Sequence, residues 1–248
     1  MVIFVEEDQF SNILEGSETL EVNHEVYHYL KNVVRVQLGQ VFTIYSLSNQ
    51  INHYKQVRCK LCGFSKPNRL MIQIEQKQEF KNNLPMIDLY IVPLKSRYMD
   101  SCIEYCCQLP INRIYLIKSQ HICVKFDEIV RKIDRLRKIS YWNSVYSKKY
   151  YVTDVNFLDD NVKNIVDKVN DVYEVMIVFD NLIDREICLK NLSRIGVLIG
   201  PEGGWSTDEI NYLLQVPKIQ IFKFRNIHTT IKSEIAPIVG ISQVLAMV

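Results

Sequence analysis

The most informative segment of the chain is Val197-Leu-Ile-Gly-Pro-Glu-Gly-Gly-Trp-Ser-Thr-Asp-Glu-Ile210. It begins with an apolar run typical of a buried strand, and a glycine-rich turn, Gly200–Gly204, follows directly. Ser206 and Glu209 then have the spacing of a capping box, which predicts that a helix begins there. A strand, a glycine turn and a helix start in this order commonly hold a nucleotide-like ligand at the edge of a parallel sheet.

Strand and helix patterns alternate on both sides of this stretch. Apolar runs typical of buried strands are Ile87–Pro93, Ile111–Ile117, Val175–Asp180, Ile195–Ile199 and Ile219–Phe224. Helical patterns are Met99–Leu109, Asp127–Tyr146 and Ser233–Met247. This alternation predicts an α/β layer with a mostly parallel sheet. The last helix is apolar almost all round, so we expect it to be buried on several sides, by the core or by a second subunit.

The N-terminal third has a different pattern. Short runs rich in β-branched and aromatic residues, separated by turn residues, predict strands at Val33–Val36, Val41–Tyr45, Val57–Leu61 and Leu70–Ile74. Several short strands at regular spacing predict a small β-barrel. The polar segment Gln78–Pro85 follows as a hinge. The sequence thus predicts two domains, residues 1–78 and residues 79–248.

Composition excludes several protein classes. The chain has 248 residues, 48% of them hydrophobic, yet it contains no run of about 20 apolar residues that could span a membrane. The N-terminus resembles neither a secretory signal nor a transit peptide, so we expect a cytoplasmic protein. Cys59 and Cys62 form a C-x-x-C without a second pair at zinc-finger spacing, so we expect no metal. The basic stretch 125–149 fits either phosphate binding or a solvated helix face.

The glycine turn is neither a P-loop nor a G-x-G-x-x-G fingerprint. The full string L-I-G-P-E-G-G-W-S-x-x-E-I resembles the signature of the SPOUT superfamily of knotted methyltransferases. It is most similar to the bacterial family that methylates N3 of a uridine in small-subunit ribosomal RNA. The second signature of that family ends in I-L-R-T-E-T-A, and Thr230-Ile-Lys-Ser-Glu-Ile-Ala236 is similar to it.

The resemblance extends over nearly the whole chain. The segments His24–Gln40, Lys95–Asp100 and Gln108–Arg113 are similar to further motifs of the same family. The resemblance implies an RNA-binding PUA- or OB-like β-barrel followed by a trefoil-knotted α/β domain. It also implies a homodimer, S-adenosylmethionine held in a bent shape by the knot loops, and ribosomal RNA or the small ribosomal subunit as partner.

Several positions depart from the family pattern. Val2-Ile-Phe-Val5 stands for R-x-F-F, Ser119-Gln-His121 for S-E-R, and Val145-Tyr-Ser-Lys-Lys149 for E-Q-S-x-R. Ile227 or His228 replaces a loop glycine, and Lys232 replaces an arginine, which removes planar bidentate donation. These departures leave two alternatives open. One is an RNA-binding ribosome-assembly factor with weakened turnover, and the other is a SPOUT methyltransferase acting on another RNA position.

The chemistry suggests two candidate catalytic residues. Uracil N3 carries a weakly acidic proton and is a poor nucleophile until that proton leaves, so a proton acceptor and donors to O2 and O4 are needed. Glu234 is the candidate acceptor and Lys232 the candidate donor. Glu202 competes with Glu234 for the first role, and a carboxylate that stabilises a helix terminus is the structural alternative for Glu234.

The resemblance also assigns binding residues. The cofactor would contact the turn and the final loop through Ile199, Gly200, Pro201, Glu202, Gly203, Gly204, Ile227, Thr230 and Ile231. RNA phosphates would contact Arg35, Lys95 and Arg97, for which solvated surface is the alternative. Trp205 fits either a cover for the cofactor or a packing residue. His24 and His28 have the spacing of a metal pair but no third ligand, so surface or packing histidines are the favoured interpretation.

Overall fold

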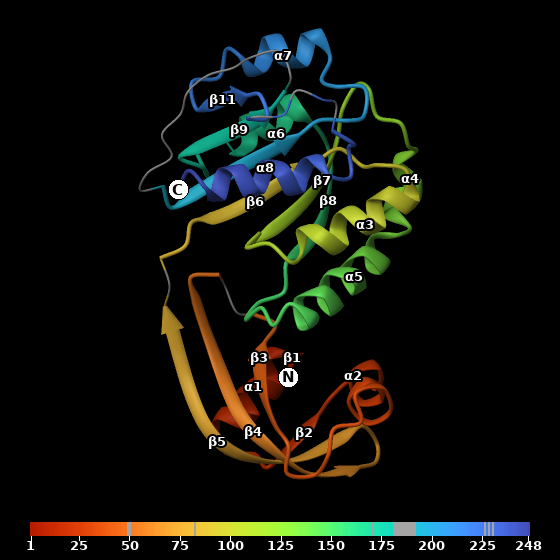
Figure 1. Ribbon diagram of the computed structural model, residues 1–248, viewed down its shortest axis with the longest axis vertical. Helices are drawn as coiled ribbons and strands as arrows, with labels where there is room; N and C mark the ends of the chain where they lie inside the picture. Colours follow the sequence, from red (N-terminus) through yellow and green to blue (C-terminus); the bar gives the residue numbers. More distant parts are fainter. Residues whose placement is uncertain are drawn as a thin grey trace. The chain divides into compact units, whose positions relative to one another are not determined.

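The computed structural model describes residues 1–48, 51–81, 83–169, 171–180, 192–225, 227, 229 and 231–248. It divides into two compact units, one of residues 1–82 and 144–152 and the other of residues 83–143 and 153–248 (Figure 1). The boundary predicted after residue 78 lies inside a strand that continues to Lys81. That strand continues because its hairpin partner pairs with it along its whole length, as far as His53 opposite Lys81.

The first unit is built on a five-stranded sheet in the order β1-β3-β4-β5-β2. Its elements are β1 (Val2–Val5), α1 (Glu7–Leu14), β2 (Thr19–Glu21), α2 (His24–His28), a π-helical turn (Tyr29–Val33), β3 (Val41–Ser46), β4 (His53–Ser65) and β5 (Arg69–Lys81). β1 and β3 are parallel, and the other neighbours are antiparallel. The strands predicted around Val41, Val57 and Leu70 are confirmed, while closure of this sheet into a barrel stays a prediction.

The strand predicted at Val33–Val36 is wrong. Residues 24–33 are helical, and Val33 is 60% exposed. Val26 and Leu30 are buried four residues apart on one helical face, and this packing outweighs the β propensity of the valines. The chain then leaves the helix through Arg35, whose φ is +54°.

Residues 144–152 return to the first unit after the helix that contains Ser144. The ring of Tyr150 stacks on Tyr54 of β4 with centroids 3.8 Å apart and planes 18° apart. Tyr54 in turn stacks on Phe80 of β5 at 5.0 Å. No local pattern in the chain predicts this return, because stacking between residues almost a hundred positions apart depends on the tertiary fold.

The second unit contains a six-stranded sheet in the order β11-β9-β10-β6-β7-β8, in which every neighbouring pair is parallel. Its elements are β6 (Met86–Ile91), α3 (Ser96–Cys106), β7 (Arg113–Lys118), α4 (Phe126–Val130), α5 (Ile133–Tyr146), β8 (Asp154–Asn161), α6 (Val162–Val169), β9 (Val175–Phe179), β10 (Arg194–Ile199), α7 (Thr207–Leu213), β11 (Ile219–Phe222) and α8 (Ala236–Leu245). The predicted α/β layer with a parallel sheet is confirmed.

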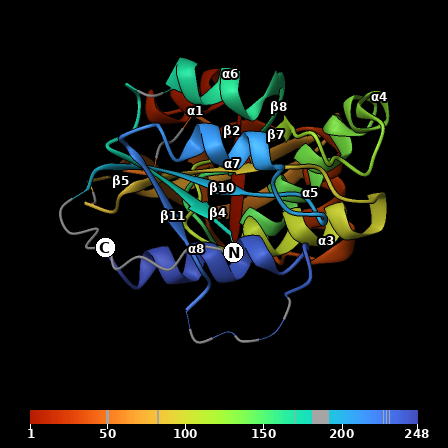
Figure 2. The same ribbon diagram turned by 90° about the horizontal axis from the view of Figure 1, so that it is seen from above.

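Alternate residues of the central strands belong to separate cores on the two faces of this sheet. In β10, Val197 and Ile199 belong to the core beneath α3, α5 and α8, while Leu198 belongs to the core beneath α6 and α7. Figure 2 shows α8 on one side of the sheet and α6 and α7 on the other. Burial on both faces explains why these strands are continuous apolar runs in the sequence.

Further differences from the predicted helices and strands occur along this unit. The single helix predicted at Asp127–Tyr146 is divided into α4 and α5. β8 and α6 were not predicted, because exposed acids such as Asp159 interrupt the apolar pattern of this region. α8 begins at Ala236 instead of Ser233, and Pro237, a residue that favours the first turn of a helix, lies at its start.

Among the described helices, none is both long enough and apolar enough to cross a bilayer. Helix α8 buries Ala236, Gly240, Ile241 and Val244. It is not covered all round, because the adjoining Ile235 is 43% exposed. The trefoil knot stays a prediction.

Candidate functional site

The candidate site lies in the second unit, where the carboxyl ends of the parallel strands meet at one edge of the sheet. The loop after β10 is the predicted glycine turn. Within it the Gly204 N–H donates to the Pro201 carbonyl at 2.9 Å, and Gly204 has a φ of +75°. A side chain at Gly204 would therefore be strained, whereas glycine adopts this conformation without cost.

The helix after this turn begins with the predicted capping box. The Ser206 hydroxyl accepts from the Glu209 N–H at 3.2 Å, and the Glu209 carboxylate accepts from the Ser206 N–H at 2.8 Å. These bonds satisfy backbone donors that the first turn of α7 would otherwise leave unpaired.

Glu209 has a second role that its spacing did not predict. Its side chain is 5% exposed and also accepts from the Ser119 hydroxyl at 3.2 Å and from the Gln120 N–H at 3.0 Å. Ser119 and Gln120 follow β7, so one buried carboxylate ties the loop after β7 to the start of α7. Those two residues belong to the segment that stands for the family's S-E-R.

His121, the next residue of that loop, lies beside the glycine turn. Its Nδ1 is 3.1 Å from the Gly204 carbonyl oxygen, and because a carbonyl accepts hydrogen bonds, Nδ1 is assigned the proton. A Cβ added to Gly203 would meet His121 at 3.5 Å, an ordinary contact. The sequence identifies His121 only as the end of the segment that stands for S-E-R, since its contact with the glycine turn joins two loops more than 80 residues apart.

Trp205 packs beneath the turn. A Cβ on Gly200 would approach the indole Cε2 and Nε1 atoms to 3.0 Å, so Gly200 is needed for this close packing. Trp205 is 7% exposed and belongs to the same core as Leu198 and Ile210. The packing interpretation of Trp205 is therefore supported. Its Nε1 has no hydrogen-bond partner within the part of the chain that the structure describes.

Helix α8 packs closely on the neighbouring strand ends. A Cβ on Gly240 would come within 2.9 Å of Phe179 and 3.1 Å of Ile199, so glycine lets the helix approach β9 and β10. The Gln243 side chain accepts from the Arg225 N–H and donates to the Arg225 carbonyl, both at 3.1 Å. These bonds anchor the loop after β11 to α8.

The two predicted catalytic residues lie in the turn that precedes α8. The Lys232 carbonyl accepts from the N–H groups of Ile235 and Ala236, at 2.9 and 3.0 Å. Glu234 is half-buried, and no hydrogen bond or ion pair to its carboxylate occurs among the described residues. Helix α8 begins without a side-chain cap. A carboxylate that stabilises the helix terminus through the dipole needs no hydrogen bond, so this alternative for Glu234 stays open.

The remaining predicted residues divide by location. Ile199 and Pro201 are buried, Glu202 and Gly203 are exposed, and Ile227 and Ile231 are half-buried. Thr230 lies outside the described residues. The three predicted RNA contacts are all exposed, Arg35 in the first unit and Lys95 and Arg97 in the second. Arg97 lies over the ring of Tyr98, with its guanidinium carbon 5.0 Å from the ring centre. Their roles stay predictions.

A second buried acid, Asp88, belongs to the fold. It is 1% exposed and accepts from Asn112 at 2.9 Å and from the Tyr173 hydroxyl at 2.8 Å. Tyr173 and Tyr90 also share a hydrogen bond, and burial raises the pKa of both hydroxyls. Among the described residues, no group of acids, histidines and cysteines is arranged to bind a metal.

Comparison with known proteins identifies the family of the chain. Residues 81–244 match the model of the RNA methyltransferase domain family. Ribosomal RNA small subunit methyltransferase E 2 of Borreliella burgdorferi is 24% identical over 201 residues, which are 80% of this chain and 80% of that protein.

Solved structures share the fold over the full length. The ribosomal RNA small subunit methyltransferase E of Neisseria gonorrhoeae, bound to S-adenosylmethionine, superposes with a TM-score of 0.76 at 18% identity, covering 99% of this chain and 96% of that one. A Legionella pneumophila protein with the same cofactor bound gives a TM-score of 0.76 at 15% identity, over 99% and 96% of the two chains. Since the family match spans the parallel sheet and the helices on both of its faces, the chain belongs to the RNA methyltransferase family.

Proposed function

We propose that this protein uses S-adenosylmethionine to methylate N3 of a uridine in small-subunit ribosomal RNA, in the cytoplasm. The observation that carries the proposal is the glycine turn after β10, built as a cradle between the loop after β7 and the start of α7. The family match and the similarity to a small-subunit rRNA methyltransferase support the same reaction class.

The residues around the turn fit this cofactor. Gly203 is exposed, and nothing lies within 4 Å of a Cβ placed on Gly204, so the turn leaves its backbone open to a ligand. At the same edge of the sheet the half-buried ring of Phe224 stacks on the buried ring of Phe179, with centroids 4.7 Å apart, so Phe224 is the apolar side chain that a ligand could reach there. An adenine ring needs apolar walls and a few backbone partners, which are the groups present here.

When bound, the cofactor supplies a methyl group on a positively charged sulfur. The task of this chain is to orient the uracil and to remove its N3 proton. In our proposal the Glu234 carboxylate accepts that proton, and the Lys232 ammonium stabilises the negative charge left on O2 and O4. Glu234 suits this role because the fold does not occupy its carboxylate, within the described residues.

Mass spectrometry of ribosomal RNA nucleosides tests the proposal. Cells that lack the gene should lose 3-methyluridine from small-subunit RNA. A plasmid copy of the wild type should restore the modified base, whereas a Glu234→Gln copy should not. Unchanged 3-methyluridine in the deletion strain would refute the uridine-N3 assignment. A different methylated nucleoside that disappears instead would identify another RNA position.

An RNA-binding assembly factor with weakened turnover is the second candidate function, and Val145–Lys149 favours it. Here Val145 is buried, and the Lys149 ammonium lies 4.2 Å from the ring centre of Tyr151, so this segment contributes packing within the first unit. This candidate predicts that purified protein binds RNA but forms no methylated product in a single-turnover assay with small subunits or their naked RNA.

We also propose that the protein is a homodimer formed through α8. Two exposed apolar side chains that flank this helix, Ile235 at 43% and Val248 at 42% exposed, support it. Light scattering should therefore give a mass near twice 29.2 kDa. A monomer at micromolar concentration would contradict the proposal.

A further inference from the structure

The first unit has a pocket with the chemistry of a nucleotide site. It has a volume of about 360 Å³ and lies between the helical segment that begins at His24 and the β4–β5 turn. Lys31 and Lys66 line it from these two elements, together with His24, Tyr27 and His28. None of the residues that line it carries a negative charge. A concave surface of one sign concentrates ligands of the opposite charge, here phosphate.

The two lysines are available for such a ligand. Within the described residues, neither Lys31 nor Lys66 forms an ion pair with an acid. By contrast, Arg69 close to the same turn lies 3.5 Å from Glu21, and Arg58 of β4 lies 3.3 Å from Glu75. The Lys31 ammonium instead lies 5.3 Å from the centre of the Tyr27 ring, a contact that an incoming phosphate can supplement.

Aromatic rings beside the pocket offer flat surfaces on which a nucleobase can stack. The imidazoles of His24 and His28 lie four residues apart on one helical face, with centroids 6.2 Å apart and planes 24° apart. Both residues are exposed. Nucleobases of single-stranded RNA stack on exposed aromatic rings, including histidine. Asn32, whose amide lies 3.0 Å from the His28 ring, orients one of these rings.

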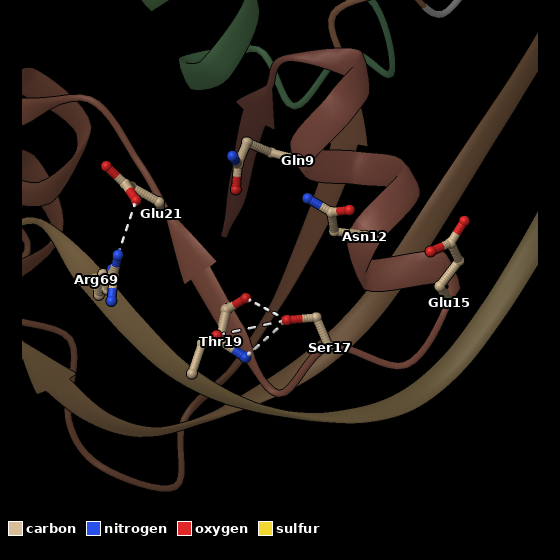
Figure 3. Close-up of a pocket in the computed structure, with 7 residues that line it drawn as sticks. All are labelled: Gln9, Asn12, Glu15, Ser17, Thr19, Glu21 and Arg69. Atoms are coloured by element: carbon tan, nitrogen blue, oxygen red, sulfur yellow. Dashed lines mark hydrogen bonds and ion pairs between the residues drawn. The ribbon is translucent and has the colours of Figure 1, made fainter.

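A second pocket on the same unit shows that this charge pattern is not general. That pocket, of about 500 Å³, is lined by Glu15 and Glu21 and by a single cation, Arg69, which is paired with Glu21 (Figure 3). Its carboxylates would repel phosphate. The pocket that contains Lys31 and Lys66 is therefore suited to a phosphate-bearing ligand, and the pocket that contains Glu15 and Glu21 is not.

We infer that the pocket lined by His24, His28, Lys31 and Lys66 binds one nucleotide from a single-stranded stretch of the RNA substrate. The lysines bind its phosphate and the histidines stack against its base. This inference rests on the proposed function for the identity of the ligand as RNA. It adds residues that are distinct from Arg35, Lys95 and Arg97.

Fluorescence anisotropy of the full-length protein with labelled deca-uridine tests the inference. The double variant Lys31→Gln/Lys66→Gln should weaken binding about tenfold. It should also lower the slope of log K against log salt by about 0.7 for each phosphate that the lysines no longer neutralise. Lys60→Gln, a lysine of β4 outside the pocket, is the matched control and should stay within about twofold of wild type.

His28→Ala separates stacking from charge. It should weaken deca-uridine binding by about tenfold, the scale of one stacked base, without changing the salt slope. A strand of the same length that lacks bases should bind wild type more weakly than deca-uridine does. Its affinity for His28→Ala should equal its affinity for wild type. If the bases prove irrelevant, the nucleotide assignment fails.

Unchanged affinity and slope in the double variant would overturn the inference, and so would wild type that does not bind deca-uridine. Neither result decides the proposed function. That function is tested by the amount of 3-methyluridine in the deletion strain, and this measurement does not depend on whether the pocket binds RNA. Conversely, normal 3-methyluridine in the deletion strain combined with a tenfold loss in the double variant would keep the RNA pocket and reject the methylation assignment. Melting temperatures of all variants exclude a general loss of folding.

Discussion

Helices α7 and α8 differ sharply at their starts, although both follow strands of the same sheet and both have a glutamate there. Glu209 of α7 is 5% exposed, and its carboxylate accepts hydrogen bonds from Ser206, Ser119 and Gln120. Glu234 before α8 is half-buried, and its carboxylate has no partner within the described residues. The first carboxylate is thus occupied by hydrogen bonds, whereas the second accepts none from the described residues.

Acidic residues in such a site can be ranked by the hydrogen bonds that their carboxylates already accept. A carboxylate whose oxygens are already occupied by backbone and hydroxyl donors is held in place by structure. A carboxylate without such partners, beside a cation such as Lys232 in the sequence, can accept a proton from a substrate. Substitutions of Glu234 and Glu209 test this ranking, and substitutions of Gly203 and Lys232 test the groups around them.

The largest effect is expected for Glu234→Gln. If Glu234 accepts the N3 proton, turnover in a single-turnover assay should fall by about 100-fold or more, while the melting temperature and the cofactor affinity change little. Glu202→Gln in the exposed glycine turn is the control, because Glu202 is the competing acceptor. A normal rate with a lowered melting point would assign Glu234 to the helix terminus and return Glu202 to consideration.

Glu209→Gln should give the opposite result. Replacing a buried acceptor that receives several hydrogen bonds should lower the free energy of unfolding by about 1–3 kcal/mol. Turnover of the fraction that stays folded should change much less than in Glu234→Gln. Asp208→Asn is the matched control, since Asp208 is an exposed acid in the same turn of α7. Equal destabilisation by the two variants in urea titrations would show that burial of Glu209 is unimportant.

Gly203→Val tests the glycine turn that precedes α7. A Cβ at this position meets His121 at an ordinary 3.5 Å, so the fold should tolerate the side chain, while the branched group blocks the approach of the cofactor. Titration calorimetry should show micromolar binding of S-adenosylmethionine to wild type and at least tenfold weaker binding to the variant. Wild-type affinity in a folded Gly203→Val would place the cofactor elsewhere.

The smallest effect is expected for Lys232→Arg, which restores the residue type of the related family. A guanidinium can donate two parallel hydrogen bonds where an ammonium offers a point charge. We expect turnover to rise by a few fold without a change in stability, as measured by single-turnover kinetics and thermal melting. A fall in rate would show that the neighbourhood of Lys232 has adapted to lysine.

The second unit was largely predictable because its signals are local. Apolar runs identified β6, β7, β9, β10 and β11, and the capping box located the start of α7 correctly. No element was predicted at β8 or α6, because exposed acids interrupt the apolar pattern there. In the first unit, Val33–Val36 was misassigned because helical packing of Leu30 outweighed the propensity of the valines.

The site was predictable only in part for a related reason. The glycine turn is a continuous segment, so its sequence identifies it. The second role of Glu209, the position of His121 and the bonds from Gln243 to Arg225 all join residues 18 to 90 positions apart. Such contacts leave no periodic pattern in the sequence. They can be identified only from the tertiary structure, in which the sheet brings these loops together.

The return of residues 144–152 to the first unit has a practical consequence for dissecting the protein. A fragment that ends near residue 82 would lack the Tyr150 ring that lies 3.8 Å from Tyr54, and it would expose that aromatic surface to water. The N-terminal part is therefore not a module that a single cut can transplant. Chimeras with related enzymes should exchange residues 1–82 and 144–152 together, and a gene fusion that exchanges the first segment alone should yield an insoluble product.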